Sequence, residues 1–113
     1  MELRDMLQIL AKQDGSDLYL STGAPPCAKF NGALRPLNEV PLEPGEVARI
    51  AAELMDSEQK QQFEKELEMN LAISLPQIGR FRVNIFKQRN EVSLVARNIK
   101  TEIPRFEDLK LPP

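Results

Sequence analysis

Hydrophobic and polar residues alternate along two runs within residues 79–99, GRFRVNIFKQRNEVSLVARNI. Two alternating runs flank a polar tip at residues 87–91, and this pattern predicts an antiparallel β-hairpin. The apolar side chains of both runs share one face when Val83 pairs with Ala96. A slip of one residue would move every side chain of one strand to the other face, so the apolar pattern selects this register.

The same register sets two positive charges against each other on the polar face. It places Arg82 directly opposite Arg97. Like charges opposite each other on neighbouring strands are unfavourable, which suggests that an anion belongs between the two guanidinium groups. The alternative is that both arginines are solvated, or paired with acidic side chains from elsewhere in the chain.

Three helices are expected from apolar residues that recur at helical spacing. The first ends before Gly15, a residue type that suits a helix C-terminal cap. The second spans residues 44–55, with its proline at the favoured first position. The third spans residues 57–67 and is a separate helix, because Asp56 and Gln59 resemble a capping box.

Short alternating runs predict the remaining strands, and Asn31-Gly32 is a strong signal for a tight hairpin turn. The resulting order is helix, strand, hairpin, two helices and three strands. This order predicts an α+β fold with helices laid against a mostly antiparallel sheet. Residues 101–113 lose periodicity and gain proline, so we expect a linker there. Besides the hairpin at residues 79–99, strands are expected at residues 16–21, 27–30, 33–37 and 71–75.

Composition narrows the class of protein. A chain of 113 residues forms one domain, and a net charge of −2 argues against a nucleic-acid binder that works through bulk electrostatics. Cys27 is the single cysteine, which excludes an internal disulfide and fits a reducing compartment. No apolar run approaches the roughly 18 residues of a membrane span. We therefore expect a cytoplasmic protein.

The residue types also limit the chemistry. The chain has no histidine, which rules out Ser-His and Cys-His nucleophile pairs and most zinc sites within it. None of its five glycines begins a G-x-x-x-x-G-K-[ST] phosphate loop or a G-x-G-x-x-G fingerprint. The acidic run Glu64, Glu66 and Glu68 is typical of a solvated helix end. We expect no catalytic residue, metal site or cofactor in this chain alone.

Four short motifs stand out: GSDLYLS at residues 15–21, Pro25-Pro26, Asn31-Gly32 and GRFRVN at residues 79–84. Together they resemble the N-terminal domain of PilT/PilU-type ATPases, the hexameric motors of type IV pilus retraction and twitching motility. Each motif is weak alone, but their order and spacing make the resemblance specific, and it covers nearly the whole chain. Tyr19 stands where the family commonly has a histidine. The ending LKLPP looks most like PilU.

The resemblance implies a PAS-like domain at residues 1–100, followed by a linker toward a RecA-like ATPase domain that this sequence does not contain. In that family, arginines of the N-terminal domain approach the nucleotide phosphates in the assembled hexamer. Arg82 and Arg97 match family arginine positions. Arg89 is a third candidate phosphate contact, although the hairpin tip differs in length by a residue from the PilT pattern.

The implied function is that of a regulatory and assembly domain in a secretion-superfamily ATPase. ATP and magnesium would be cofactors of the full-length enzyme. The implied partners are the chain's own RecA-like domain, neighbouring subunits of a homohexamer, a paralogous PilT-type ATPase and the pilus platform protein. The implied location is the cytoplasmic side of the inner membrane, at the pilus machine, with no nucleic acid bound and no membrane insertion.

Two other functions stay open at this point. The chain could be a stand-alone PAS-like sensor of a small ligand, although it has no histidine, no tryptophan and one tyrosine for a cofactor pocket. It could also be a protein-interaction module that docks through residues 44–55 and 57–67. Individual residues have simpler interpretations, with Asp17 as a turn or strand-end hydrogen-bond acceptor and Cys27 as a small buried hydrophobe.

Overall fold

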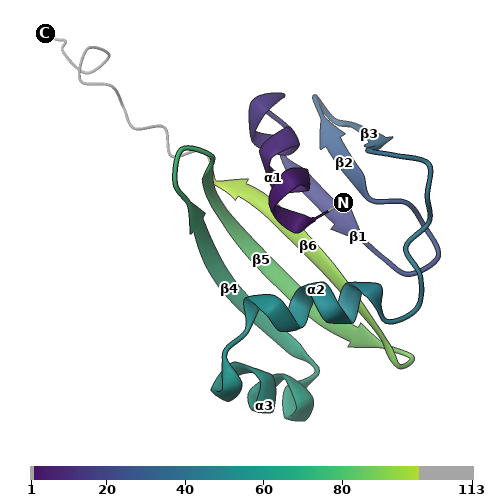
Figure 1. Ribbon diagram of the computed structural model, residues 1–113, viewed down its shortest axis with the longest axis vertical. Coiled ribbons are helices and arrows are strands. Elements are labelled where there is room, and N and C mark those ends of the chain that lie inside the picture. Colours follow the sequence, from purple (N-terminus) through teal and green to yellow (C-terminus); the bar gives the residue numbers. More distant parts are fainter. Residues whose placement is uncertain (1, 100–113) are drawn as a thin grey trace, which may run out of the picture.

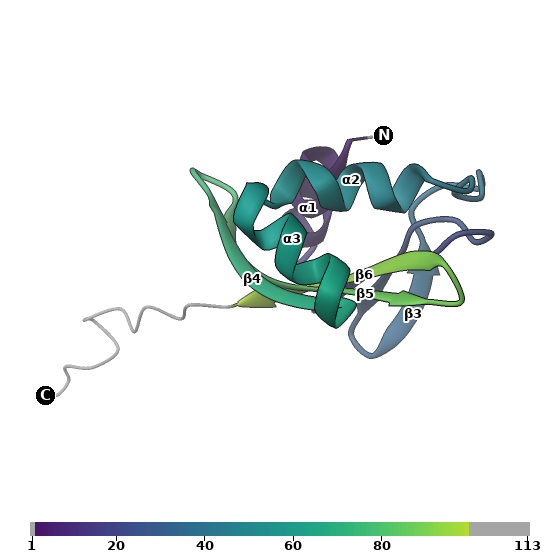
Figure 2. The same cartoon turned by 90° about the horizontal axis from the view of Figure 1, so that it is seen from below.

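The computed structural model describes residues 2–99, which form a six-stranded antiparallel sheet with three helices on one face (Figures 1 and 2). The elements in chain order are α1 (Leu3–Lys12), β1 (Asp17–Leu20), β2 (Cys27–Phe30), β3 (Ala33–Pro36), α2 (Glu46–Leu54), α3 (Ser57–Glu66), β4 (Glu68–Leu75), β5 (Gly79–Gln88) and β6 (Glu91–Ile99). The strand order across the sheet is β3-β2-β1-β6-β5-β4. The predicted α+β class and order of elements are confirmed. The expected linker at residues 101–113 lies outside the described residues.

The core lies between the helices and the sheet, and β5 shows how the sequence pattern produces it. Phe81, Val83 and Ile85 are fully buried, while Arg80, which precedes Phe81, and Arg82, which follows it, are exposed. Burying one such apolar side chain stabilises the fold by about 1.5–3 kcal/mol, so this alternation fixes which face of β5 turns inward. Other fully buried side chains that complete the core are Met6, Leu7, Leu10, Leu18, Leu20, Val47 and Leu94.

Two local predictions are confirmed in detail. Asn31 and Gly32 both have positive φ angles, 51° and 82°, as a two-residue type I′ hairpin turn requires. The backbone N–H of Gln59 donates to Asp56 Oδ1 over 2.8 Å, and the backbone N–H of Asp56 donates to Gln59 Oε1 over 3.0 Å. This reciprocal capping box starts α3 as a separate helix.

The end of α1 differs from the prediction. Asp14, rather than Gly15, takes the left-handed conformation, with a φ of 57°. The N–H groups of Gly15 and Asp14 donate to the carbonyl oxygens of Leu10 (2.7 Å) and Ala11 (3.2 Å), the two bonds of a Schellman motif. Gly15 is needed for space, because a Cβ there would lie 2.6 Å from Leu10 Cδ1 and 2.8 Å from Phe30 Cε1.

The boundaries of the other two helices also shift. Pro44 does not start α2, because Gly45 has a φ of 88° and acts as the N-cap of a helix that begins at Glu46. Leu67 is a left-handed C-cap that is 47% exposed, not an apolar position of α3. The chain turns there into β4, so Glu68 belongs to a strand and not to an acidic helix end.

Replacing Gly15 with alanine should destabilise the fold by about 1–3 kcal/mol, the usual cost of an overpacked core. The added methyl group would overlap Leu10 and Phe30. Urea unfolding of Gly15→Ala measures the loss. In a Phe30→Leu background the smaller side chain leaves room, and the same substitution should cost less. An equal loss in both backgrounds would show that steric overlap with the ring is not the cause.

Candidate functional site

The sheet face opposite the helices, called the open face below, carries a row of charged side chains across four strands. Lys29 of β2, Asp17 of β1, Arg97 of β6 and Arg82 of β5 are successive cross-strand partners. We call these four residues the charged row. It contains three cations and one carboxylate, a formal charge of +2. The predicted hairpin register is confirmed, because Arg82 and Arg97 are direct partners.

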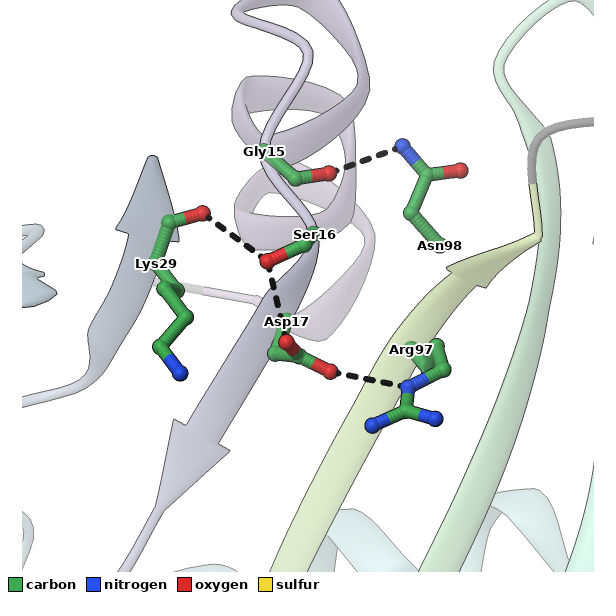
Figure 3. A network of polar contacts seen from close by, with 6 residues as sticks. All are labelled: Gly15, Ser16, Asp17, Lys29, Arg97 and Asn98. Atoms are coloured by element: carbon green, nitrogen blue, oxygen red, sulfur yellow. Dashed lines mark hydrogen bonds and ion pairs between the residues drawn. The ribbon is translucent and has the colours of Figure 1, made fainter. Parts of the chain in front are cut away.

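An ion pair between neighbouring strands occupies the middle of the charged row (Figure 3). Arg97 Nε donates to Asp17 Oδ1 over 3.1 Å, and Ser16 Oγ donates to the other carboxylate oxygen, Oδ2, over 2.9 Å. The Asp17 side chain is 8% exposed, whereas that of Arg97 is 72% exposed. Arg97 is therefore paired with an acidic side chain from another part of the chain, which is the alternative that the sequence left open for both arginines.

Backbone bonds also hold the segment that carries this carboxylate. The N–H of Ser16 donates to the carbonyl oxygen of Lys29 over 2.9 Å, and the N–H of Asn98 donates to that of Ser16 over 2.9 Å. Asn98 Nδ2 also donates to the carbonyl oxygen of Gly15 over 3.1 Å. These bonds tie the start of β1 to both β2 and β6, so Asp17 is held from two sides.

Arg82 has a different environment. It is exposed, and its partners on the two neighbouring strands are Arg97 and Ala72. Within residues 2–99 no carboxylate forms an ion pair with it. One arginine of the pair is therefore neutralised, and the other presents its full charge on the open face.

Arg89 lies apart from this pair. It forms the hairpin turn with Asn90, and both residues have positive φ angles, 51° and 69°. Arg89 lies seven positions beyond Arg82, which at about 3.3 Å per position along a strand corresponds to roughly 23 Å. The structure brings Arg82 and Arg97 together and leaves Arg89 at the far end of the hairpin. A polar hollow beside it is lined by Thr22, Gln88, Arg89, Glu91 and Ser93.

Two residues have partners that differ from the simple interpretation of the sequence. Asp17 is a hydrogen-bond acceptor as expected, but its cationic partner, Arg97, lies 80 residues away in the sequence. Only the adjacency of β1 and β6 brings these two residues together. Cys27 is half-buried on the open face and not fully buried, and its Sγ donates to the carbonyl oxygen of Pro25 over 3.3 Å.

Residues 2–99 contain no cluster of histidine, cysteine or acidic side chains that could hold a metal ion. In the same part of the chain, no helix has the length and apolar character needed to cross a membrane.

Comparison with known proteins identifies relatives of this chain. No family model matches the chain. It is 42% identical over 112 residues to the type IV pilus ATPase PilU of Pseudomonas aeruginosa, covering 99% of this chain and 29% of that protein. It is 36% identical over 109 residues to the type IV pilus retraction ATPase PilT of the same species, covering 96% of this chain and 32% of that protein.

A solved structure agrees with the sequence relatives. The crystal structure of the pilus retraction motor PilT with bound ADP matches at a TM-score of 0.84 and 29% identity, over 99% of this chain and 33% of that one. The chain thus spans about a third of the length of the proteins it matches. It is a homologue of PilU and PilT that corresponds to the N-terminal part of these type IV pilus ATPases.

Proposed function

We propose that this chain is the N-terminal regulatory and assembly domain of a hexameric ATPase that powers type IV pilus retraction. In this proposal residues 1–100 are the domain, and residues 101–113 connect it to a RecA-like domain that binds ATP and magnesium. The observation that carries the proposal is the arginine pair on the open face of a domain homologous to PilT. ATP hydrolysis belongs to the longer protein and not to this chain.

The arginine pair suits a phosphate. Guanidinium is planar, offers bidentate donors and stays charged at any cellular pH. An oxyanion between Arg82 and Arg97 would relieve the repulsion that their pairing creates. Arginines delivered from one domain to a nucleotide on another stabilise the charge of a phosphoryl-transfer transition state, or sense which nucleotide is bound. The open face is therefore the side that we assign to the nucleotide-binding neighbour.

Arg89 is the third proposed phosphate contact, and its position separates it from the other two. At roughly 23 Å along β5 from Arg82, it cannot share one phosphate group with the pair. We assign it to a separate contact, made by the hairpin tip. There Thr22 Oγ1 donates to Glu91 Oε1 over 2.9 Å, which ties the tip to the end of β1.

The partners and location follow from the same proposal. The domain would contact its own RecA-like domain and neighbouring subunits of the hexamer, in the cytoplasm at the inner-membrane face of the pilus machine. A paralogous PilT-type ATPase and the pilus platform protein would be further partners.

In the longer protein, Arg82→Ala should lower ATP turnover about tenfold or more while the fold stays intact. One charged hydrogen bond to a phosphate contributes about 1.5–3 kcal/mol, and 1.4 kcal/mol corresponds to a factor of ten. Arg82→Lys keeps the charge but loses the bidentate geometry, so it should rescue turnover only in part. Steady-state phosphate release beside melting temperature measures both effects.

Arg49→Ala is the matched control for this measurement. Arg49 lies on α2, on the helix side of the sheet, where its exposed side chain pairs with Glu53 over 3.3 Å. Its loss should leave turnover unchanged. Normal turnover in Arg82→Ala together with a melting temperature several degrees lower would mean that Arg82 has a structural role, and the proposed phosphate contact would be wrong.

The isolated 113-residue chain should hydrolyse no ATP above background. It contains neither a phosphate loop nor the side chains that such enzymes use to hold magnesium beside it. A phosphate-release assay on repurified chain provides the check. Turnover that persists through a second purification and follows this chain through the column would contradict the proposal.

A further inference from the structure

We propose that Asp17 is a positioning residue for Arg97, holding the guanidinium by Nε so that its terminal nitrogens face the incoming phosphate. This inference rests on the proposed function, since the phosphate is the one assigned to the arginine pair. It adds a residue to the site that does not itself touch the nucleotide.

The contacts of the guanidinium support this role. A guanidinium carries five N–H donors in one plane, and Asp17 engages the one on Nε. Within the described residues, Nη1 and Nη2 of Arg97 have no protein acceptor, and both lie beyond the bonded Nε (Figure 3). The two terminal nitrogens together form the end-on fork that matches two oxygens of a phosphate. The bond to Asp17 therefore leaves the phosphate-binding edge free.

The Asp17 carboxylate is placed to orient the guanidinium of Arg97 and does not itself attract the phosphate. The Asp17 side chain is buried, and Ser16 Oγ donates a hydrogen bond to its second oxygen, Oδ2. Its negative charge lowers the positive charge that a phosphate meets on the open face. Removing Asp17 should therefore affect the geometry of Arg97 more than the attraction for nucleotide. In kinetic terms, kcat should fall while KM for ATP changes little.

The two arginines should then respond differently to lysine. Arg82 has no carboxylate partner in residues 2–99, so a lysine there can still turn its ammonium toward a phosphate. At position 97 a lysine has a single ammonium group and no planar fork of donors. It cannot bond to Asp17 and bind a phosphate in a bidentate way at the same time. Arg97→Lys should therefore lose more turnover than Arg82→Lys.

Stability offers a readout that needs no nucleotide. Arg97→Ala leaves a buried carboxylate without its cationic partner, and we expect the melting temperature of this chain to fall by about 3–6 °C. Arg82→Ala removes one member of a like-charged pair and should leave the melting temperature unchanged or slightly higher. Equal melting temperatures for Arg97→Ala and the unmodified chain would overturn the proposed hold of Asp17 on Arg97.

The decisive experiment is a double-mutant cycle in the longer protein. Asp17→Ala and Arg97→Ala should each lower kcat about tenfold, with KM for ATP within about threefold of normal. The double variant should be no slower than Arg97→Ala alone, because Asp17 acts only through Arg97. Asp5→Ala, which removes an exposed carboxylate from α1, is the matched control and should leave kcat unchanged.

The outcomes separate the two proposals. Normal kcat in Arg97→Ala would overturn the proposed function itself. A slow Arg97→Ala with a normal Asp17→Ala, or losses that multiply in the double variant, would overturn only the positioning role. If Asp17→Ala fails to fold, Asp17→Asn keeps the shape and one acceptor oxygen. Its kcat should then lie between those of the unmodified protein and Arg97→Ala, and a normal value would overturn the positioning role.

Nuclear magnetic resonance gives a direct view of the same bond in this chain. The Nε–H of Arg97 should exchange slowly with water, and this protection should disappear in Asp17→Ala. The Nε–H of Arg82 should exchange fast in both. Exchange of the Arg97 Nε–H as fast as that of Arg82 in the unmodified chain would overturn the positioning role.

Discussion

The pairing register of β5 with β6 is the constraint on which the open face depends. A slip of one residue in β6 would bring Arg97 to the core face and expose apolar side chains of the same strand, among them Leu94, which is fully buried in the observed register. Burial of each such side chain contributes about 1.5–3 kcal/mol, whereas a cross-strand charge pair contributes only about 0.2–1 kcal/mol. The core therefore decides the register, and the juxtaposition of Arg82 with Arg97 follows as a consequence.

Strand β1, which lies on the other side of β6, reduces the repulsion between Arg82 and Arg97. β1 supplies Asp17, whose carboxylate neutralises Arg97 and is itself held by Ser16. The sheet thus contains one arginine, Arg97, that a carboxylate orients, and one, Arg82, that forms no ion pair within residues 2–99. In the described residues no helix covers the face that carries these two guanidinium groups (Figure 2). This face is therefore suited to bind a phosphate brought by a neighbouring domain.

Local pattern was sufficient to predict the hairpin register, the Asn31-Gly32 turn and the Asp56 capping box, because each depends on residues close in the sequence or on one alternating face. The local pattern could not predict contacts between strands that are distant in the sequence. The bond from Arg97 to Asp17 requires β1 to lie beside β6, and no local pattern specifies that order of strands. Left-handed residues were also missed, since Asp14, Leu67 and Arg89 take positive φ angles at positions where intrinsic preference would favour glycine or asparagine.

The central claim is that the open face presents Arg82 and Arg97 to a nucleotide phosphate, with Arg97 held by Asp17. A structure of the longer protein with magnesium and a non-hydrolysable ATP analogue tests it most directly. We expect the terminal nitrogens of both arginines at hydrogen-bond distance, about 2.7–3.2 Å, from phosphate oxygens, with Arg97 Nε still bonded to Asp17. An assembled, nucleotide-filled hexamer whose phosphates contact neither arginine would contradict the account.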